Sequence, residues 1–169
     1  MRTVAFSVEG IPQPKGSTRA FVPKGWTRPI ITAASPKTKK WEREITAVAR
    51  QHITPFDTSK SAFRVRLRFV LPRPKRLGAA FSPHITRPDI DKLCRCVLDA
   101  LTGVAWHDDA QVVTITATKR YVRQALMEAT RVDISLVEVR DEQGRIELSR
   151  AGVSQIHTEA ERAAEAKSS

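Results

Sequence analysis

Residues 63–71 alternate without interruption between apolar and basic side chains, and no other stretch of the sequence restricts the fold as strongly. The apolar positions are Phe63, Val65, Leu67, Phe69 and Leu71, and the basic positions between them are Arg64, Arg66 and Arg68. Successive side chains of a β-strand point to opposite faces, so the pattern predicts a strand with one buried face and one arginine face. Three arginines without an acidic neighbour in the sequence repel one another, which favours a bound anion such as phosphate. A solvated sheet face is the plainer alternative.

The rest of the sequence predicts two helices and three further strands around this one. Ser35-Pro36 is typical of a helix start, with a hydroxyl N-cap and proline at the first helical position. Helical spacing follows at Trp41, Ile45, Val48 and His52, and again at Ile90, Leu93, Val97 and Leu101, with a stop at Gly103. The expected elements are, in chain order, a strand near 4–8, a basic loop over 10–29, a helix from 36 that ends before Pro55, the strand 63–71, a basic loop over 72–88, a helix over 89–102, and strands over 112–122 and 131–139. This order predicts an α+β domain with a small mixed β-sheet and two main helices.

The chain of 169 residues has the length of one domain, and its last part differs in composition. Residues 141–169 hold no proline and no aromatic residue and end in an Ala/Glu-rich run. We therefore expect a folded domain over 1–140 and a C-terminal tail over 141–169, partly disordered or helical. The absence of a long apolar run and of a secretory pattern, together with only two cysteines, predicts a cytoplasmic protein without a membrane partner.

The formal net charge of +11 is concentrated in two acid-free windows, 10–41 and 58–88, which hold seven and eight of the 29 Lys and Arg residues. A basic excess confined in this way indicates a surface for a polyanion, with nucleic acid as the first candidate and a solubility device as the alternative. The candidate DNA contacts are Lys15, Arg19, Arg64, Arg66, Arg68, Arg73, Lys75, Arg76, Arg87 and Lys92.

Two pairs of carboxylates bracket the helix predicted over 89–102. Asp89 and Asp91 stand at its start, where an extended-to-helix junction lets them converge, and Asp108-Asp109 lies in the turn that follows. Oxygen-only ligands suit Mg²⁺ or Mn²⁺. Zinc is disfavoured, because His107 stands alone beside the acids and Cys94 and Cys96 lack the spacing of a metal knuckle. Whether the two pairs meet depends on the path of the following strand or on a second subunit.

Asp89 and three further charged residues of the same helix also have structural explanations. Asp89 stands where a helix cap is expected. Lys92 lies three residues after Asp89 and is explained first by a helix salt bridge. Arg95 lies four residues after Asp91, so a salt bridge and a contact to the scissile phosphate are equally favoured. Asp99 is explained equally well as the ion-pair partner of Arg95.

The motifs RPDIDKL, VLDALTG and W-x-DDAQV, over residues 87–112, resemble those of the RusA-like Holliday junction resolvases, which are common in phages and prophages. The stretch GIPQPKG from Gly10 is similar to one found in some members. The resemblance implies that Asp89, Asp91 and Asp109 are the essential carboxylates, with Asp108 adjacent. It also implies a Mg²⁺-dependent homodimer that nicks a four-way junction symmetrically in DNA recombination and repair. Lys92 replaces an Asn that is frequent in the family, and Arg95 replaces a frequent Lys.

The residues and the resemblance predict the same function, a Mg²⁺-dependent endodeoxyribonuclease for which Mn²⁺ is a possible substitute. Asp89, Asp91 and Asp109, with Asp108 as a fourth candidate, hold the metal, and Arg95 contacts the phosphate under attack. One alternative is a non-catalytic basic nucleic-acid-binding protein, in which the acids are caps and ion-pair partners. Another is a metal-dependent nuclease that acts on other branched DNA or on RNA.

Overall fold

The protein was analysed as a computed structural model. The structure describes residues 2–16, 20–21, 24–25, 27–28, 30–31, 35–54, 61–77, 83–123 and 126–139. The tail expected over 141–169, the domain boundary at 140 and the candidate DNA contact Arg19 lie outside the described residues.

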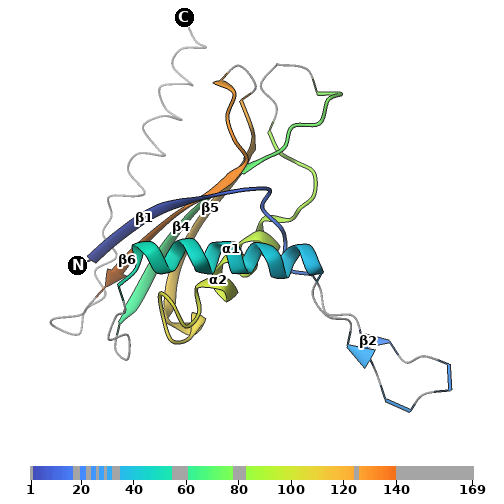
Figure 1. Cartoon of the computed structure of the whole chain (residues 1–169), viewed down its shortest axis with the longest axis horizontal. Helices are drawn as coiled ribbons and strands as arrows, with labels where there is room; N and C mark the ends of the chain where they lie inside the picture. Colours follow the sequence, from blue (N-terminus) through green and yellow to red (C-terminus); the bar gives the residue numbers. More distant parts are fainter. Residues whose placement is uncertain are drawn as a thin grey trace, which may run out of the picture.

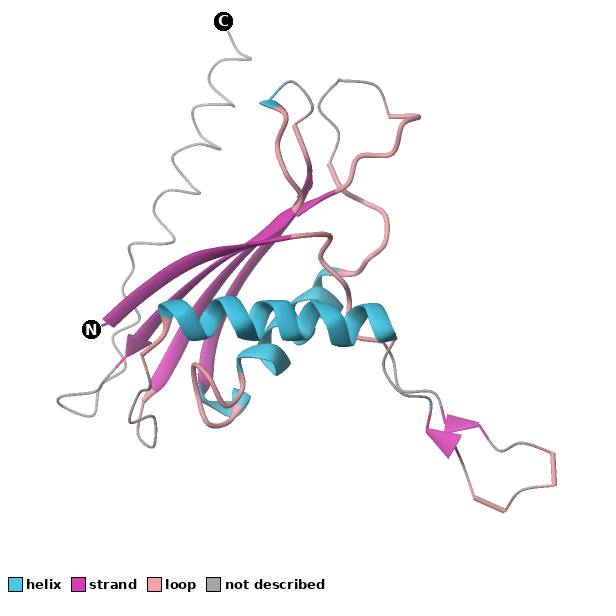
Figure 2. Ribbon diagram, viewed as in Figure 1, coloured by secondary structure: helices cyan, strands magenta, loops and turns pink. Residues whose placement is uncertain are grey.

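A mixed four-stranded sheet forms the body of the molecule, with the strand order β1-β6-β4-β5. The strands are β1 (Arg2–Glu9), β4 (Ala62–Leu71), β5 (Val112–Tyr121) and β6 (Arg131–Val139). β4 and β5 run parallel, whereas β6 pairs antiparallel with both β1 and β4. The two helices, α1 (Pro36–His52) and α2 (Ile90–Leu101), lie along one face of this sheet (Figure 1, Figure 2). The α+β fold with a small mixed sheet and two main helices is therefore confirmed.

Between β1 and α1 the chain adds a feature that the sequence pattern did not predict. The expected basic loop over 10–29 is interrupted by a strand of two residues, β2 (Ala20–Phe21), which pairs antiparallel with β3 (Ile30–Ile31). Strands this short carry no readable alternation, so only the proline and glycine content of the segment was visible. In Figure 1 this hairpin stands away from the sheet and helices.

The hydrophobic core fills the space between the helices and the sheet. The five apolar residues of the alternating stretch in β4 are buried, and they pack with Trp41 and Ile45 of α1 and with Leu93 and Val97 of α2. His52, expected on the buried face of α1, is exposed at the end of the helix, where its ring stacks on Phe6 with the ring centroids 5.4 Å apart.

The helix starts follow the predicted positions, but the caps do not follow the predicted chemistry. α1 begins at Pro36, yet the hydroxyl of Ser35 makes no capping hydrogen bond. At the end of β1, Gly10 adopts φ +131°, and a Cβ atom there would lie 2.6 Å from Cζ3 of Trp41. Only glycine accommodates both the backbone angle and the indole, and this turn directs residues 11–14 toward α2.

In the described part of the chain, no helix is both long and apolar enough to cross a membrane.

Candidate active site

The carboxylates at the start of α2 are exposed to solvent. Asp89 occupies the N-cap position with an extended backbone, and Asp91 lies in the first turn. The predicted N-cap position of Asp89 is therefore confirmed, although its side chain makes no capping hydrogen bond. Its carboxylate instead pairs with the ammonium of Lys92 at 3.0 Å, as the salt-bridge interpretation of Lys92 predicted. The Asp91 side chain is exposed and has no hydrogen bond or ion pair with any other described residue.

Basic side chains surround Asp89 from three directions. Lys92 lies on α2, Arg87 lies in the preceding loop, and Lys119 reaches over from β5. The hydrogen bond and charge of Lys92, followed by the charges of Arg87 and Lys119, lower the pKa of Asp89 below its ordinary value. Asp89 is therefore ionised at neutral pH, which is the form that binds a cation.

Lys119 is a residue of this region that the sequence analysis missed. Its ammonium donates hydrogen bonds to the carbonyl oxygens of Thr86 and Pro88, each at 2.9 Å, and so fastens the loop before α2 to β5. The sequence could have identified Lys119 by its alternation position, because Lys119 shares the helix-covered face of β5 with Ala117 and Tyr121. A charged residue on a face that is otherwise apolar needs polar partners.

Arg95 is exposed and forms no ion pair with another described residue. The predicted pair between Arg95 and Asp99 is wrong, because Asp99 pairs with Lys15 at 2.6 Å. Lys15 also pairs with Glu42 of α1 at 2.6 Å, so its ammonium links the two helices. Although partial burial lowers it, the hydrogen bonds to Asp99 and Glu42 raise the pKa of Lys15. Lys15, a candidate DNA contact, thus has two carboxylate partners within the protein.

The second acidic pair has a different environment. η1 (Asp109–Gln111) is a short 3₁₀ turn, and the carboxylate of Asp108 accepts a hydrogen bond from the amide of Ala110 at 2.8 Å. In return, the side-chain oxygen of Gln111 accepts hydrogen bonds from the amides of His107 and Asp108, which completes a capping box. The Asp109 side chain is exposed and makes no hydrogen bond or ion pair with another described residue.

The two acidic pairs lie at opposite ends of β5. Asp109 begins η1, the turn that leads directly into β5, whereas Asp89 follows Pro88, whose carbonyl oxygen accepts a hydrogen bond from Lys119 near the other end of that strand. Seven residues of strand separate Val112 from Lys119, a distance of about 23 Å. Among the described residues, no three His, Cys, Asp or Glu side chains are grouped closely enough to hold a metal ion. One chain therefore does not bring Asp109 to Asp89 and Asp91.

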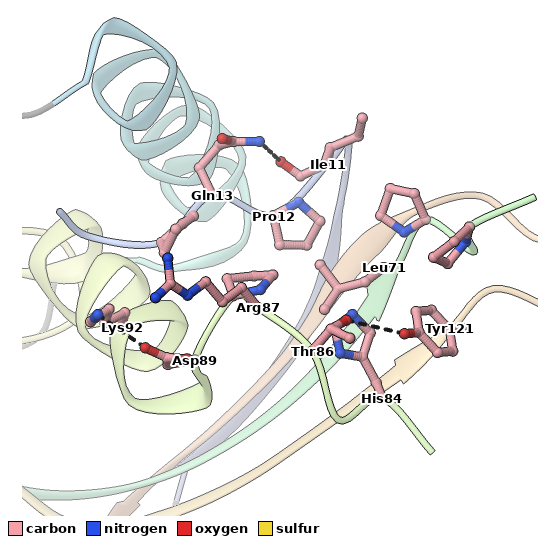
Figure 3. Close-up of a pocket in the computed structure, with 14 residues that line it drawn as sticks. Ile11, Pro12, Gln13, Leu71, His84, Thr86, Arg87, Asp89, Lys92 and Tyr121 are labelled. Carbon is pink, nitrogen blue, oxygen red and sulfur yellow. Dashed lines mark hydrogen bonds and ion pairs between the residues drawn. The ribbon is translucent and has the colours of Figure 1, made fainter. Parts of the chain in front are cut away.

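A cleft of about 620 Å³ opens beside Asp89 and Lys92 (Figure 3). Its back wall contains Tyr121 and His84, whose ring centroids are 4.3 Å apart. The Tyr121 hydroxyl lies 3.2 Å from Oγ1 of Thr86, and the Arg73 guanidinium lies over the tyrosine ring at 5.7 Å from its centroid. His84 is buried, and burial, together with the charge of Lys119, lowers its pKa.

The arginines of β4 lie on the face of the sheet opposite the helices and so on the far side from α2. The open face is hollowed into a cavity of about 880 Å³, lined in part by Arg66 and Arg68. The expectation that no acid neighbours these arginines is wrong for Arg68, which binds Asp133 of β6 at 2.8 Å. Pairing of β4 with β6 brings this acid from a distant part of the sequence. Burial raises the pKa of Asp133, but hydrogen bonds from Ser7, Arg68 and Arg131 lower it further than burial raises it.

The other candidate DNA contacts lie at the same end of the sheet as Asp89. Lys75, Arg76 and Arg87 are exposed on the loops between β4 and α2. Arg73 lies on the same connection, with Nε donating to the carbonyl oxygen of Leu77 at 3.1 Å. The structure therefore divides the predicted basic surface into a loop group beside the carboxylates and a strand group on the open face.

Two comparisons with known proteins found similar sequences. The model of the family "Endodeoxyribonuclease RusA" matches residues 12–136, a stretch that contains both acidic pairs, Arg95 and all but one of the residues that line the cleft. The uncharacterized protein YqaN of Bacillus subtilis (strain 168) is 26% identical over 149 residues, which cover 82% of this chain and 99% of YqaN.

Proposed function

Because the chain belongs to the RusA family of endodeoxyribonucleases, we propose that it is a Mg²⁺-dependent enzyme that resolves four-way DNA junctions by paired symmetrical nicks, in recombination and repair. The observation that carries this proposal is the environment of Asp89 and Asp91. Both carboxylates are exposed, the Asp89 side chain makes no capping hydrogen bond, and basic side chains surround Asp89. A carboxylate pair of this kind suits a metal ion and a phosphate together.

The residues present fit a hard divalent cation. Mg²⁺ is usually bound through one or two carboxylates, with water and substrate phosphate completing its shell, and Asp89 and Asp91 offer such a pair. When bound, Mg²⁺ supplies a Lewis acid for the phosphodiester and a water primed for attack. Lys92 keeps Asp89 ionised, Lys119 holds the backbone that positions it, and Arg87 and Arg95 bind the phosphate oxygens.

A homodimer accounts for the separation of Asp109 from the other carboxylates. β5 is an outer strand of the sheet, and its Val113 and Ile115 side chains are 49% and 44% exposed. Antiparallel pairing of β5 with β5 of a second copy, around a two-fold axis, places the start of one strand beside the end of the other. Asp109 then lies beside the partner's Asp89 and the partner's Asp91, and each site takes carboxylates from both chains.

The two groups of basic residues serve different parts of the DNA in this proposal. Lys75, Arg76 and Arg87 bind phosphates close to the cleavage point, and Arg64 and Arg66 on the open sheet face bind a junction arm. Such contacts supply affinity without reading the base sequence. Lys15 and Arg68 are excluded from this role because carboxylates of the protein already bind them.

A nicking assay tests the proposed function. A mobile four-way junction, a flap and a linear duplex are incubated with the protein in Mg²⁺, in Mn²⁺ and in chelator. We expect paired nicks in the junction with either metal, none in chelator, and little cleavage of the duplex. Equal cleavage of duplex and junction, or cleavage in chelator, contradicts the proposal.

Mixing two inactive variants tests the shared site. Asp91→Asn and Asp109→Asn are each expected to be inactive as homodimers. A heterodimer of the two contains one site with both substitutions and one intact site, if Asp109 acts on the partner subunit. Mixed and re-equilibrated protein should therefore regain single nicks in the junction. If the mixture stays inactive although heterodimers form, Asp109 does not act across the interface.

A further inference from the structure

Beyond the metal-binding carboxylates, the cleft next to Asp89 has the chemistry of a binding site. We propose that it binds one nucleobase of the DNA, unpaired at the branch point and adjacent to the scissile phosphate. This inference rests on the proposed function and deepens it, because it identifies the part of the protein that selects a branched substrate.

The walls of the cleft offer apolar surfaces against which a flat ring can pack. Leu71 lies in the wall, Ile11 is 53% exposed there, and proline rings make up much of the remaining lining. The prolines are Pro12, Pro14, Pro72, Pro74 and Pro88. A volume of about 620 Å³ exceeds that of a single base and leaves room for the sugar. Nucleobases have apolar faces and polar edges, and this lining suits the faces.

A small number of polar groups within the lining suit the edges of a base. Among the described residues, Nδ1 of His84 has no hydrogen-bond partner, and His84 is only 7% exposed. Gln13 donates from Nε2 to the carbonyl oxygen of Ile11 at 2.9 Å, which leaves its side-chain oxygen as an acceptor. Buried polar atoms are normally paired, so the unpaired nitrogen of His84 points to a ligand.

The cleft is formed before any ligand arrives. The amide of Lys15 donates to the carbonyl oxygen of Lys92 at 2.9 Å, which fixes the segment over 11–14 against α2. On the opposite side, Tyr121 is held between His84 and Arg73 and lies beside Thr86. A preformed site loses little ordering entropy on binding.

The rim of the cleft joins it to the proposed catalytic groups. Asp89, Arg87 and Lys92 line the cleft at the side of α2 (Figure 3). A phosphate bound by Arg87 therefore places its neighbouring base at the mouth of the cleft. Extruding a base from an intact duplex costs a few kcal/mol, whereas a base at a branch point is already partly unstacked. The site thus favours branched DNA over duplex.

Abasic junctions test the base directly. The two nucleotides that flank the scissile phosphate are made abasic one at a time, and junction binding is measured in chelator so that no cleavage occurs. We expect one of the two substitutions to weaken binding by the wild-type protein by about fivefold or more, the effect of losing one bound base. Unchanged binding for both abasic junctions overturns the proposal.

A filled cleft provides the matching protein variant. Ile11→Trp places a large ring in the cleft, and we expect this variant to bind the intact and abasic junctions equally. Leu126→Trp is the control, because Leu126 is 66% exposed and lies outside the cleft lining, and it should respond to the abasic site as the wild type does. An abasic effect of full size in Ile11→Trp overturns the assignment to this cleft.

A fluorescent base keeps the test independent of the variants. With 2-aminopurine at the responsive nucleotide, binding of the wild-type protein should raise the fluorescence as the base leaves the stack, and no rise contradicts the proposal. Cleavage of the intact junction in Mg²⁺ is measured alongside. If the protein cleaves the intact junction but binds abasic and intact junctions equally, only the base-binding role of the cleft is contradicted. If the protein binds no junction, both this role and the proposed function are contradicted.

Discussion

The two acidic pairs look alike in the sequence but differ in what surrounds them. At the start of α2, Asp89 and Asp91 make no hydrogen bond to the backbone at the helix start, and Lys92 and Lys119 lie close by. At the far end of β5, Asp108 is hydrogen-bonded to the turn that it caps. The difference shows that an acidic pair acquires a role from the donors within its reach. A backbone amide binds the Asp108 carboxylate, whereas Lys92 pairs with Asp89 and the Asp91 side chain has no partner among the described residues. The proposed metal and phosphate site therefore uses Asp89 and Asp91.

Substituting one acid of each pair should give the largest contrast. Asp91→Asn is expected to lower junction cleavage at least about a hundredfold while binding persists, because it removes a proposed metal ligand. Asp108→Asn should cleave within a few-fold of the wild type, because asparagine also caps a helical turn. Single-turnover nicking rates in Mg²⁺ measure both effects, with circular dichroism as the control for folding. Equal losses in the two variants would remove the distinction between Asp91 as a metal ligand and Asp108 as a structural cap.

Lys119→Met tests whether the backbone before α2 must be held. Methionine keeps the aliphatic stem but loses the hydrogen bonds to the carbonyl oxygens of Thr86 and Pro88. We expect cleavage to fall about tenfold at limiting Mg²⁺, with a higher Mg²⁺ concentration for half-maximal rate, because groups that orient metal ligands tune metal affinity. Lys119→Arg should recover part of the loss. A lower rate with an unchanged Mg²⁺ midpoint would show that Lys119 does not position the metal ligands.

Much of this arrangement could be predicted from the sequence, because the periods of β4, α1 and α2 are local signals. The start of α2 at an extended Asp89 also followed from the neighbouring proline and helical spacing. Three features could not be predicted, since each depends on chain segments that meet only in the fold. Asp133 of β6 pairs with Arg68 of β4, and Lys15 pairs with Asp99 of α2. Lys119 of β5 donates a hydrogen bond to the carbonyl oxygen of Pro88. The separation of Asp109 from Asp89 depends on strand direction, which spacing alone does not define.

Substituting Glu128 tests the ion pairs that hold the connection between β5 and β6, at the end of β5 that lies near Asp89. Hydrogen bonds from Arg120 lower the pKa of Glu128 to about 2, with further contributions from Arg123 and Arg131. Glu128→Gln should reduce the free energy of unfolding by about 2–3 kcal/mol at neutral pH. The folded pKa lies below the unfolded value of 4.5, so this stabilisation is present above 4.5 and is lost as the pH falls through about 2.

Urea denaturation from pH 7 to pH 2 measures this difference. The difference in free energy of unfolding between the wild type and Glu128→Gln should narrow below pH 4.5 and disappear near pH 2, the unfolded and folded pKa values of Glu128. Glu44→Gln is the matched control, because Glu44 pairs with Lys40 at 3.8 Å on the surface of α1. A gap that stays constant across the range would show that the ionised form of Glu128 is not what stabilises the fold.

Lys15 connects α1 with the last turn of α2. Its ammonium binds Glu42 and Asp99 at 2.6 Å each, and its side chain is 25% exposed. Lys15→Ala leaves both carboxylates without this cation, so we expect the free energy of unfolding to fall by about 1–2 kcal/mol in urea denaturation. Lys40→Ala removes a pair whose lysine side chain is 80% exposed and should change the free energy of unfolding by less than about 0.5 kcal/mol.

Because Lys15 already has these partners, Lys15→Ala should also leave the salt dependence of junction binding unchanged. Loss of a phosphate contact would instead lower the slope of log binding constant against log salt concentration by about one. A reduced slope would return Lys15 to the DNA surface and weaken the contrast between structural and DNA-binding charges.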